Sequence, residues 1–268
     1  GYSRYRRYYK DAIDVLGVDI NIMRVGKYKS AVEPYMRNDM SEPAREANLR
    51  WLGALWNAYL TDVAKARSME RSKLEDYIEN YNRHLEEAAG NTAKAAKKAG
   101  LVDTLMTPEQ LRLKMIQWTG GDKKDKTYKR IHYLTYLNAS DHDRWGTESG
   151  GNTVGIIIAK GSIVDGYQSP GEIGGYSTAA LIRRARLDDS VKALVVRIDS
   201  GGGSTFASEY IRRGLELVRE EGKPVVVSMG SVTASGGYWI AMAADEIYAY
   251  PTTITRSIGI YGMFPTFQ

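Results

Sequence analysis

The fold of the second half of the chain is decided by one stretch, Val225-Val226-Val227-Ser228-Met229-Gly230-Ser231-Val232-Thr233-Ala234-Ser235-Gly236-Gly237-Tyr238-Trp239. Its three consecutive valines predict a buried strand, and a short polar turn follows. Ser235 then begins a helix of small residues over 236–244. A hydroxyl at that point lies near free backbone N–H groups and the positive end of the helix dipole, which favours an alkoxide or a bound oxyanion. Serine is also a preferred N-cap residue, so a purely structural capping role is the alternative.

The composition is that of an ordinary globular protein. The chain has 268 residues, of which 43% are hydrophobic and 26% charged, with a net charge of +5. This charge is modest for the length, and we expect no nucleic-acid partner. The absence of cysteine excludes disulfides, thiolate metal sites and cysteine nucleophiles, and we expect neither a metal nor another cofactor. No apolar run reaches the roughly 18 residues of a membrane span. The chain begins without methionine, so we expect a fragment or a processed protein.

A loop with two lysines follows the first predicted strand. Residues 19–25 alternate between apolar and polar side chains, as in a half-buried strand. The loop Gly26-Lys27-Tyr28-Lys29-Ser30-Ala31-Val32-Glu33-Pro34 comes next. Loops at strand ends often carry functional residues, although two solvated lysines are the simpler interpretation.

The remainder of the first half is predicted to be mostly helical. Ser41 is the expected N-cap of a long helix, and its apolar stripe is suited to core packing or a subunit contact. Further helices are expected over 71–85, 92–99 and 108–118, with a short strand within 100–105. Residues 119–152 are polar and glycine-rich, and we interpret them as a linker with a strand at 131–137. The basic cluster at 123–130 is interleaved with aspartates, which favours a solvated loop over a nucleic-acid site.

From residue 153 onward, predicted strands and helices alternate, which indicates an α/β unit with a parallel sheet built from βαβ units. Two glycine-rich turns follow neighbouring strands, Gly201-Gly202-Gly203 and Ser235-Gly236-Gly237. Glycines allow close approach of a ligand to backbone N–H groups, and two such groups facing a serine make an oxyanion hole. Neither turn has the spacing of a nucleotide-binding loop.

A serine nucleophile needs a base, and none of the three histidines lies at a strand end of the α/β unit. These are His84, His132 and His142. No Gly-x-Ser-x-Gly motif is present, so the remaining chemistry is a serine–lysine pair. A lysine acts as a base only where burial or a nearby cation lowers its pKa, which the sequence alone does not reveal.

The segment 233–239 resembles the nucleophile segment of the S49 family of serine peptidases, in particular its long, tandem-domain branch of signal peptide peptidases (protease IV). Three more segments resemble that family in the same order: the lysine segment at 24–34, the glycine loop at 199–204, and Thr255-Arg256-Ser257-Ile258-Gly259. The similarity extends over nearly the whole chain. Two residues depart from the family pattern, since Gly201 stands where a proline is usual and Arg256 where a glycine is usual. The first change should loosen the loop slightly, and the second places a cation beside the proposed site.

The resemblance implies Ser235 as the nucleophile and Lys29 as the general base. It also implies an oxyanion hole made by Gly202, Gly203 and Gly236, with Ser257 helping to orient the lysine. Within the loop, Lys29 is chosen over Lys27 because it directly precedes Ser-Ala-Val-Glu-Pro.

The implied fold is an α/β, ClpP/crotonase-like one. Residues 1–118 would form the mostly helical second half of a first repeat. Residues 119–152 would be a linker, and residues 153–268 the first half of a second repeat.

The expected function is therefore that of a serine endopeptidase with a Ser-Lys dyad. It would hydrolyse apolar peptides such as signal-peptide remnants on the periplasmic side of a bacterial inner membrane. Membrane association would come through a segment outside this chain, and a ring-like homo-oligomer is implied. The alternatives are a crotonase-like acyl-CoA enzyme, which shares the oxyanion geometry without serine acylation, and a non-catalytic assembly fragment.

Overall fold

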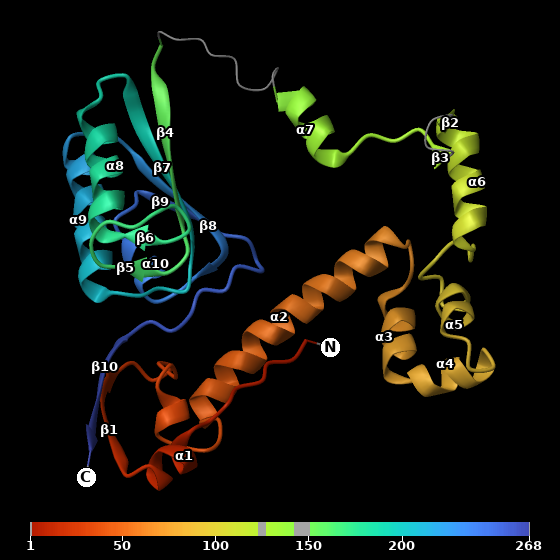
Figure 1. The fold of residues 1–268 in the computed structure, drawn as a ribbon, viewed down its shortest axis with the longest axis horizontal. Coiled ribbons are helices and arrows are strands. Elements are labelled where there is room, and N and C mark those ends of the chain that lie inside the picture. Colours follow the sequence, from red (N-terminus) through yellow and green to blue (C-terminus); the bar gives the residue numbers. More distant parts are fainter. Residues whose placement is uncertain (1, 123–126, 142–150, 268) are drawn as a thin grey trace. The chain divides into compact units, whose positions relative to one another are not determined.

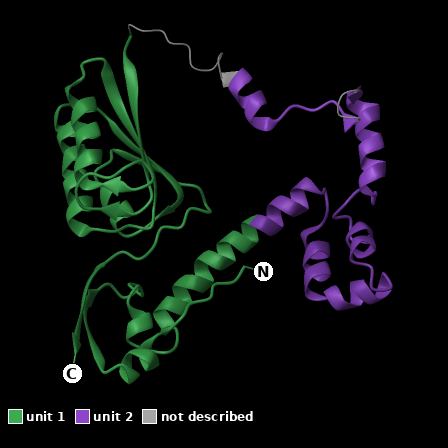
Figure 2. Ribbon diagram, viewed as in Figure 1, with its two compact units in different colours: residues 1–58, 151–268 green, residues 59–150 purple. Residues whose placement is uncertain are grey.

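The computed structural model describes residues 2–122, 127–141 and 151–267, and the chain divides into two compact units (Figure 2). One unit combines Gly1–Ala58 with Gly151–Gln268, and the other contains Tyr59–Gly150. The first unit thus joins the lysine loop to the α/β segment. The repeat boundaries expected at 118 and 152 concern the relation to a longer protein and stay a prediction.

A four-stranded parallel sheet forms the centre of the first unit, in the order β4-β7-β8-β9 (Figure 1). This confirms the α/β class with a parallel sheet. Its strands are β4 (Thr153–Lys160), β7 (Val191–Ser200), β8 (Val225–Thr233) and β9 (Glu246–Tyr248). The register between β7 and β8 shifts near their carboxyl ends, where Ile198 pairs with Met229 but Ser200 pairs with Thr233. The two extra residues of β8 form a bulge immediately before the turn that carries Ser235.

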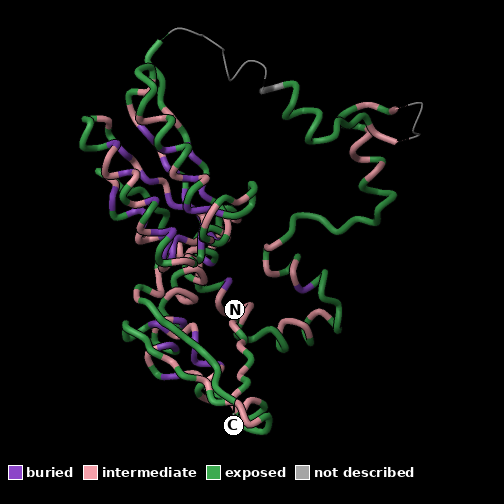
Figure 3. The backbone as a smooth tube through the Cα atoms, turned by 60° about the vertical axis from the view of Figure 1, so that its left-hand side comes forward, coloured by how far each residue is buried: buried purple, intermediate pink, exposed green. Residues whose placement is uncertain are grey.

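Three helices pack on the sheet: α8 (Gly175–Leu187), α9 (Thr205–Glu220) and α10 (Gly236–Ala241). The inner side of α9 repeats at helical spacing, with Ala207, Ile211, Leu215 and Val218 all essentially inaccessible to solvent. They meet the buried side chains of β7 and β8, and the buried backbone concentrates in this layer (Figure 3). The core of the unit therefore lies directly beneath the turn that holds Ser235.

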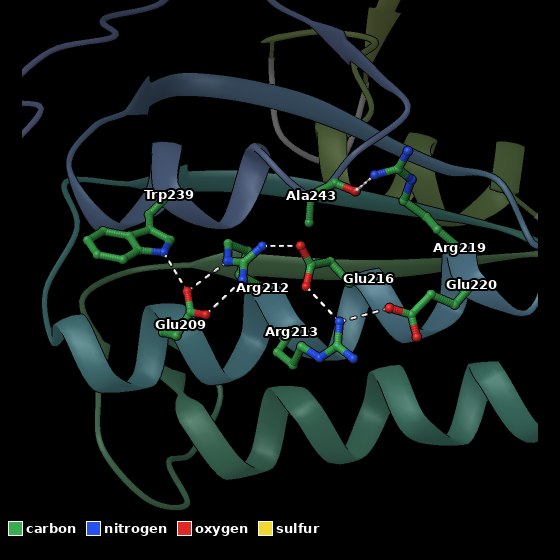
Figure 4. Close-up of polar contacts among 8 residues, drawn as sticks. All are labelled: Glu209, Arg212, Arg213, Glu216, Arg219, Glu220, Trp239 and Ala243. Atoms are coloured by element: carbon green, nitrogen blue, oxygen red, sulfur yellow. Dashed lines mark hydrogen bonds and ion pairs between the residues drawn. The ribbon is translucent and has the colours of Figure 1, made fainter.

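The outer side of α9 carries a chain of ion pairs (Figure 4). Arg212 bridges Glu209 and Glu216, and Arg213 bridges Glu216 and Glu220. Glu209 also accepts a hydrogen bond of 2.8 Å from the indole N–H of Trp239, which belongs to α10. These contacts lower the pKa of Glu209 to about 2, with the Arg212 hydrogen bond as the largest cause and that of Trp239 next. The network links α9 to the helix that follows Ser235.

The amino-terminal part of the first unit contains α1 (Lys10–Val15), β1 (Val18–Val25), the 3-10 helix η1 (Glu33–Tyr35) and the start of α2 (Glu42–Ala66). β1 pairs in antiparallel fashion with β10 (Ile260–Phe267), as a ribbon separate from the parallel sheet. Ser41 caps α2 as expected, since its hydroxyl accepts a hydrogen bond from the N–H of Ala44. A second small sheet pairs β5 (Ile163–Val164) with β6 (Ile173–Gly174).

The second unit is mostly helical. Its elements are the end of α2, then α3 (Arg71–Glu79), α4 (Tyr81–Glu87), α5 (Thr92–Lys98), α6 (Pro108–Thr119), the short strands β2 (Gly121–Asp122) and β3 (Thr127–Tyr128), and α7 (Tyr133–Asp141). In the described part of the chain, no helix combines the length and apolarity needed to cross a membrane.

Three local predictions for this unit were wrong. The single helix over 71–85 is divided at Asn80, whose side-chain amide donates to Asp76 and whose backbone leaves helical geometry. Residues 100–105 form no strand. Residues 131–137 belong mostly to α7, because their tyrosine and leucine side chains recur three residues apart, as on a helix rather than a strand. Part of the basic cluster at 123–130 lies outside the described residues.

Candidate active site

Ser235 occupies the N-cap position of α10 but does not cap it. Its side chain makes no capping hydrogen bond, and its backbone has φ 50° and ψ −119°. Positive φ is costly for a residue with a Cβ atom and persists only where the surroundings enforce it. Here the Ser235 N–H donates to the Arg256 carbonyl at 3.0 Å, and the Ser235 carbonyl accepts from the Trp239 N–H. The purely structural capping interpretation is therefore wrong, and the hydroxyl is free for another partner.

That partner is Lys29. Its Nζ lies 2.8 Å from Ser235 Oγ and 3.1 Å from the Ser257 carbonyl oxygen, although 206 positions separate the lysine and Ser235 in sequence. The ammonium also lies over the ring of Tyr261, 5.7 Å from its centroid. Lys29 is 4% exposed and makes no ion pair with any described residue. Burial accordingly lowers the pKa of Lys29, which moves the amine toward the neutral form that a general base requires.

The neighbouring lysine has a different environment. The side chain of Lys27 is 66% exposed, and its ammonium lies 4.0 Å from Glu46. The backbone of the loop is held by Arg24, whose guanidinium donates to the Lys29 carbonyl at 3.2 Å and lies 3.7 Å from the buried carboxylate of Glu33. Glu33 accepts a hydrogen bond in turn from the hydroxyl of Ser41 at the start of α2. Strand β1, the loop and α2 thus fix the position of Lys29.

The glycine loop after β7 approaches Ser235 closely. A Cβ atom on Gly202 would lie 2.7 Å from the Ser235 Cβ and 2.8 Å from the Gly236 nitrogen, and Gly202 has φ +99°. The Gly202 N–H donates to the hydroxyl of Ser200 at 3.1 Å. The N–H groups of Gly203 and Gly236 have no acceptor among the described residues. The N–H groups of Gly203 and Gly236 are therefore available beside Ser235. Gly202 supplies no free donor, but its missing side chain lets the loop approach Ser235 closely.

The segment around Ser257 contributes through its backbone. Lys29 bonds the carbonyl of Ser257 rather than its hydroxyl, and Ser257 has φ 61°. The Arg256 side chain lies over Trp51, with 5.9 Å between the guanidinium carbon and the ring centroid. The Arg256 charge is not among the causes that lower the pKa of Lys29, so burial alone accounts for the direction.

The sequence pattern of peptidase family S49 matches residues 2–120 and 218–268, which include both Lys29 and Ser235. This chain belongs to peptidase family S49. The match covers more than half of the chain.

Curated relatives support the membership in family S49. Protease 4 of Salmonella typhi is 43% identical over the whole chain, and Protease 4 of Haemophilus influenzae (strain ATCC 51907 / DSM 11121 / KW20 / Rd) is 41% identical over the whole chain. The chloroplastic serine protease SPPA of Arabidopsis thaliana is 34% identical over 91% of the chain. The chain spans 42%, 43% and 35% of the lengths of these proteins.

Among solved structures, a ClpP1 mutant from Listeria monocytogenes matches 33% of the chain, and the chain covers 46% of it, at 19% identity and a TM-score of 0.27. The fold assignment therefore rests on the sheet topology.

Sequence reasoning named Lys29 and Ser235, which the structure brings into contact, but it assigned no role to several residues that support them. Arg24, Glu33, Ser200 and Tyr261 all contact the dyad loops through groups described above. Ser200 had a local signal, because a serine directly before glycines often bonds a backbone N–H two residues on. Glu33 lies in the Ser-Ala-Val-Glu-Pro run that marks the lysine segment, but its contacts with Arg24 and Ser41 were not readable from the sequence. Tyr261 had no local signal, because its partner Lys29 lies on another element. His84 is paired with Asp76 and His132 lies beside Tyr133, both in the other unit, while His142 lies outside the described residues.

Proposed function

We propose that the full-length protein is a serine endopeptidase in which Ser235 is the nucleophile and Lys29 the general base. The observation that carries this proposal is the 2.8 Å contact between a buried lysine amine of lowered pKa and a serine hydroxyl in strained backbone geometry. A neutral amine accepts the hydroxyl proton as the oxygen attacks a peptide carbonyl. The Ser257 carbonyl keeps the amine directed toward Oγ.

Each later step is assigned to a named group near Ser235. The N–H groups of Gly203 and Gly236 would stabilise the oxyanion of the tetrahedral intermediate. The protonated Lys29 then gives its proton to the leaving amine, and an acyl-enzyme ester forms on Ser235. Water, activated by the neutral Lys29, hydrolyses that ester and returns the hydroxyl. Gly202 contributes by letting the glycine loop pack closely against the backbone of Ser235 and Gly236.

The finer parts of the proposal rest on the resemblance to long tandem signal peptide peptidases. We propose apolar peptides, including signal-peptide remnants, as substrates, and the periplasmic face of a bacterial inner membrane as the location. A homo-oligomer, a membrane segment outside residues 1–268, and the tandem arrangement with boundaries near 118 and 152 belong to the same proposal. The names of the relatives, Protease 4 and serine protease SPPA, support proteolysis as the activity.

Two alternatives make different predictions. A crotonase-like acyl-CoA enzyme would use the paired N–H groups without acylating a serine, so a buried lysine in contact with that serine would have no role. A non-catalytic assembly fragment would retain the dyad geometry without turnover. The Lys29–Ser235 contact favours the peptidase over the acyl-CoA enzyme.

Covalent labelling tests the proposal. The full-length protein is treated with a serine-acylating or sulfonylating inhibitor, and the adduct is mapped by peptide mass spectrometry. A stoichiometric adduct on Ser235, absent from Ser235→Ala and greatly slowed in Lys29→Ala, is expected. An unlabelled Ser235 in a folded protein that nevertheless hydrolyses peptides would overturn the assignment of the nucleophile.

A further inference from the structure

A cavity of about 430 Å³ lies beside the dyad and is used by none of the steps above. One wall is the first part of α2, from Glu46 to Leu55, and the other is the segment from Pro251 to Ile258 that precedes β10. Both walls belong to the first compact unit.

The lining combines an apolar surface with two arginines. Trp51, Leu55 and Ile254 supply apolar surface, and Arg50 and Arg256 supply the charge. Neither arginine forms an ion pair with any described residue. One carboxylate, that of Glu46, also lines the cavity. It is already engaged, because it accepts hydrogen bonds from the Tyr28 hydroxyl at 3.2 Å and lies 4.0 Å from the Lys27 ammonium.

Positive charge also accumulates behind Arg256. Arg4 donates to the Asn48 side-chain oxygen, and Arg6 donates to the Ala31 carbonyl. Within the described residues, neither guanidinium forms an ion pair. Burial lowers the pKa of Arg256, and the charges of Arg4 and Arg6 lower it further. Arg256 is a partly buried guanidinium that lies over the neutral ring of Trp51 and close enough to two other guanidiniums to be repelled by them, and a bound anion would relieve that repulsion.

The cavity wall is hydrogen-bonded to both Ser235 and Lys29. The Arg256 carbonyl accepts from the Ser235 N–H, and the Ser257 carbonyl accepts from the Lys29 amine. The Ile254 carbonyl accepts from the Thr233 N–H, and the Ile254 N–H donates to the Ser231 carbonyl. A ligand in the cavity therefore lies against the same backbone segment that orients the nucleophile and the base.

We propose that this cavity binds the free C-terminal carboxylate of an apolar peptide, with the carboxylate paired to Arg256 and Arg50 and the last side chains packed on Trp51 and Leu55. This rests on the proposed peptidase function, since it supplies apolar peptides to the neighbouring dyad. Arg–carboxylate pairs are strong because two parallel N–H groups match the two oxygens. An intact precursor has no such carboxylate at this place in its sequence, so the cavity selects peptides that have already been released by a first cleavage.

The test compares two forms of one peptide. The full-length Ser235→Ala protein is titrated with a fluorescent apolar decapeptide carrying either a free C-terminal carboxylate or a C-terminal amide. The free acid should bind at least about tenfold more tightly, the scale of one charge-assisted contact. Arg256→Gln should abolish this preference, and Arg50→Gln should reduce it. Arg45→Gln is the matched control on the same helix, outside the cavity, and should keep the full preference.

Equal binding of acid and amide, or a preference that persists in Arg256→Gln, overturns the proposal. Decanoate is the competing anion. If it displaces the peptide with higher affinity and with the same dependence on Arg256, the cavity is a fatty-acid site and the peptide assignment is wrong. Hydrolysis by the unmutated protein is measured in parallel. A retained acid preference without any hydrolysis contradicts the proposed peptidase function but leaves the carboxylate site supported.

Discussion

The two halves of the proposed dyad are supported in different ways. Ser235 follows β8 and begins α10, and both elements are anchored by fully buried side chains such as Val225, Val227 and Ile240. Lys29 follows β1, whose partner β10 is exposed along its whole length. Its loop is fixed by a few polar contacts and a short buried run that includes Val32 and Glu33. The position of Ser235, which is held by a core, should therefore tolerate surface changes, whereas the position of Lys29, which is held by single hydrogen bonds, should not.

The largest effect is expected at the base itself. Lys29→Ala removes the only amine in contact with Ser235 among the described residues, so turnover of an apolar peptide should fall by at least about 10³-fold in the full-length protein. Lys27→Ala is the matched control two residues away. Because Lys27 is solvent-exposed, its removal should change turnover by less than about tenfold. A dead Lys27→Ala variant with an active Lys29→Ala variant would exchange the two roles.

The pH dependence follows from the lowered pKa of Lys29. The rate should rise with pH as the amine loses its proton, and it should level off below the ordinary lysine value of 10.5. The free energy of unfolding should also rise with pH over this range. Burial disfavours the charged amine in the folded chain, so the penalty is present below the lowered pKa and is relieved as the pH rises from there toward 10.5. Lys29→Met should remove that rise in a series of urea titrations at increasing pH.

The sequence predicted the serine half in more detail than the lysine half. Strand β8, helix α9 and the glycine loop were readable because β-branched runs, helical periodicity and turn residues are local signals. The Lys29–Ser235 contact was implied only by family resemblance, since no local pattern joins residues 206 positions apart. Whether Lys29 is buried depends on β10 and on the loop geometry, which composition does not encode.

The same difference between local signals and contacts of distant residues explains the predictions that were wrong. Residues 131–137 were predicted as a tyrosine-bearing strand within the linker, yet α7 covers most of them. Propensity is a weak guide for such short segments, and tertiary context decides between helix and strand. Gly202 was expected to donate to an oxyanion, but its N–H is bonded to Ser200. A sequence identifies the glycine loop as a candidate site but does not show which of its N–H groups stays free.

A further prediction tests the glycine loop beside Ser235. Gly202→Val would place a Cβ 2.7 Å from the Ser235 Cβ and 2.8 Å from a backbone nitrogen, at a φ of +99°. The loop must shift, so turnover should fall by about 10²-fold or more, the scale of a lost oxyanion donor. Gly201→Ala is the control, because a Cβ there meets nothing within 4 Å. If both variants keep full turnover, the loop is only a turn.

The next prediction concerns the contacts that hold the lysine loop in place. Glu33 is 2% exposed and links Arg24 to the cap of α2. Glu33→Ala leaves these partners unsatisfied, so the free energy of unfolding should fall by about 1–3 kcal/mol. Turnover should fall several-fold as the loop loosens. Glu33→Gln keeps the shape and should recover part of both losses. Unchanged turnover in a destabilised Glu33→Ala protein would show that Lys29 is held independently of Glu33.

The smallest effect is expected on the outer side of α9. This prediction tests whether the position of Ser235 depends on surface contacts or on the core. Glu209 bonds Arg212 and Trp239 and has a pKa of about 2, against an ordinary value of 4.5. Its stabilisation is therefore present above pH 4.5 and is lost as the pH falls toward 2. Because both partners remain partly open to solvent, Glu209→Gln should lower the free energy of unfolding at pH 7 by only about 0.2–1 kcal/mol. The difference from the unmutated protein should vanish near pH 2, as measured by urea unfolding at both pH values.

Glu220→Gln, at the end of the same ion-pair chain and without a contact to α10, is the control. Turnover at pH 7 should stay within about twofold in both variants, because the core under β8 and α10 fixes Ser235. A large loss of turnover in Glu209→Gln alone, at unchanged stability, would mean that the Trp239 contact, and not the core, sets the position of the nucleophile.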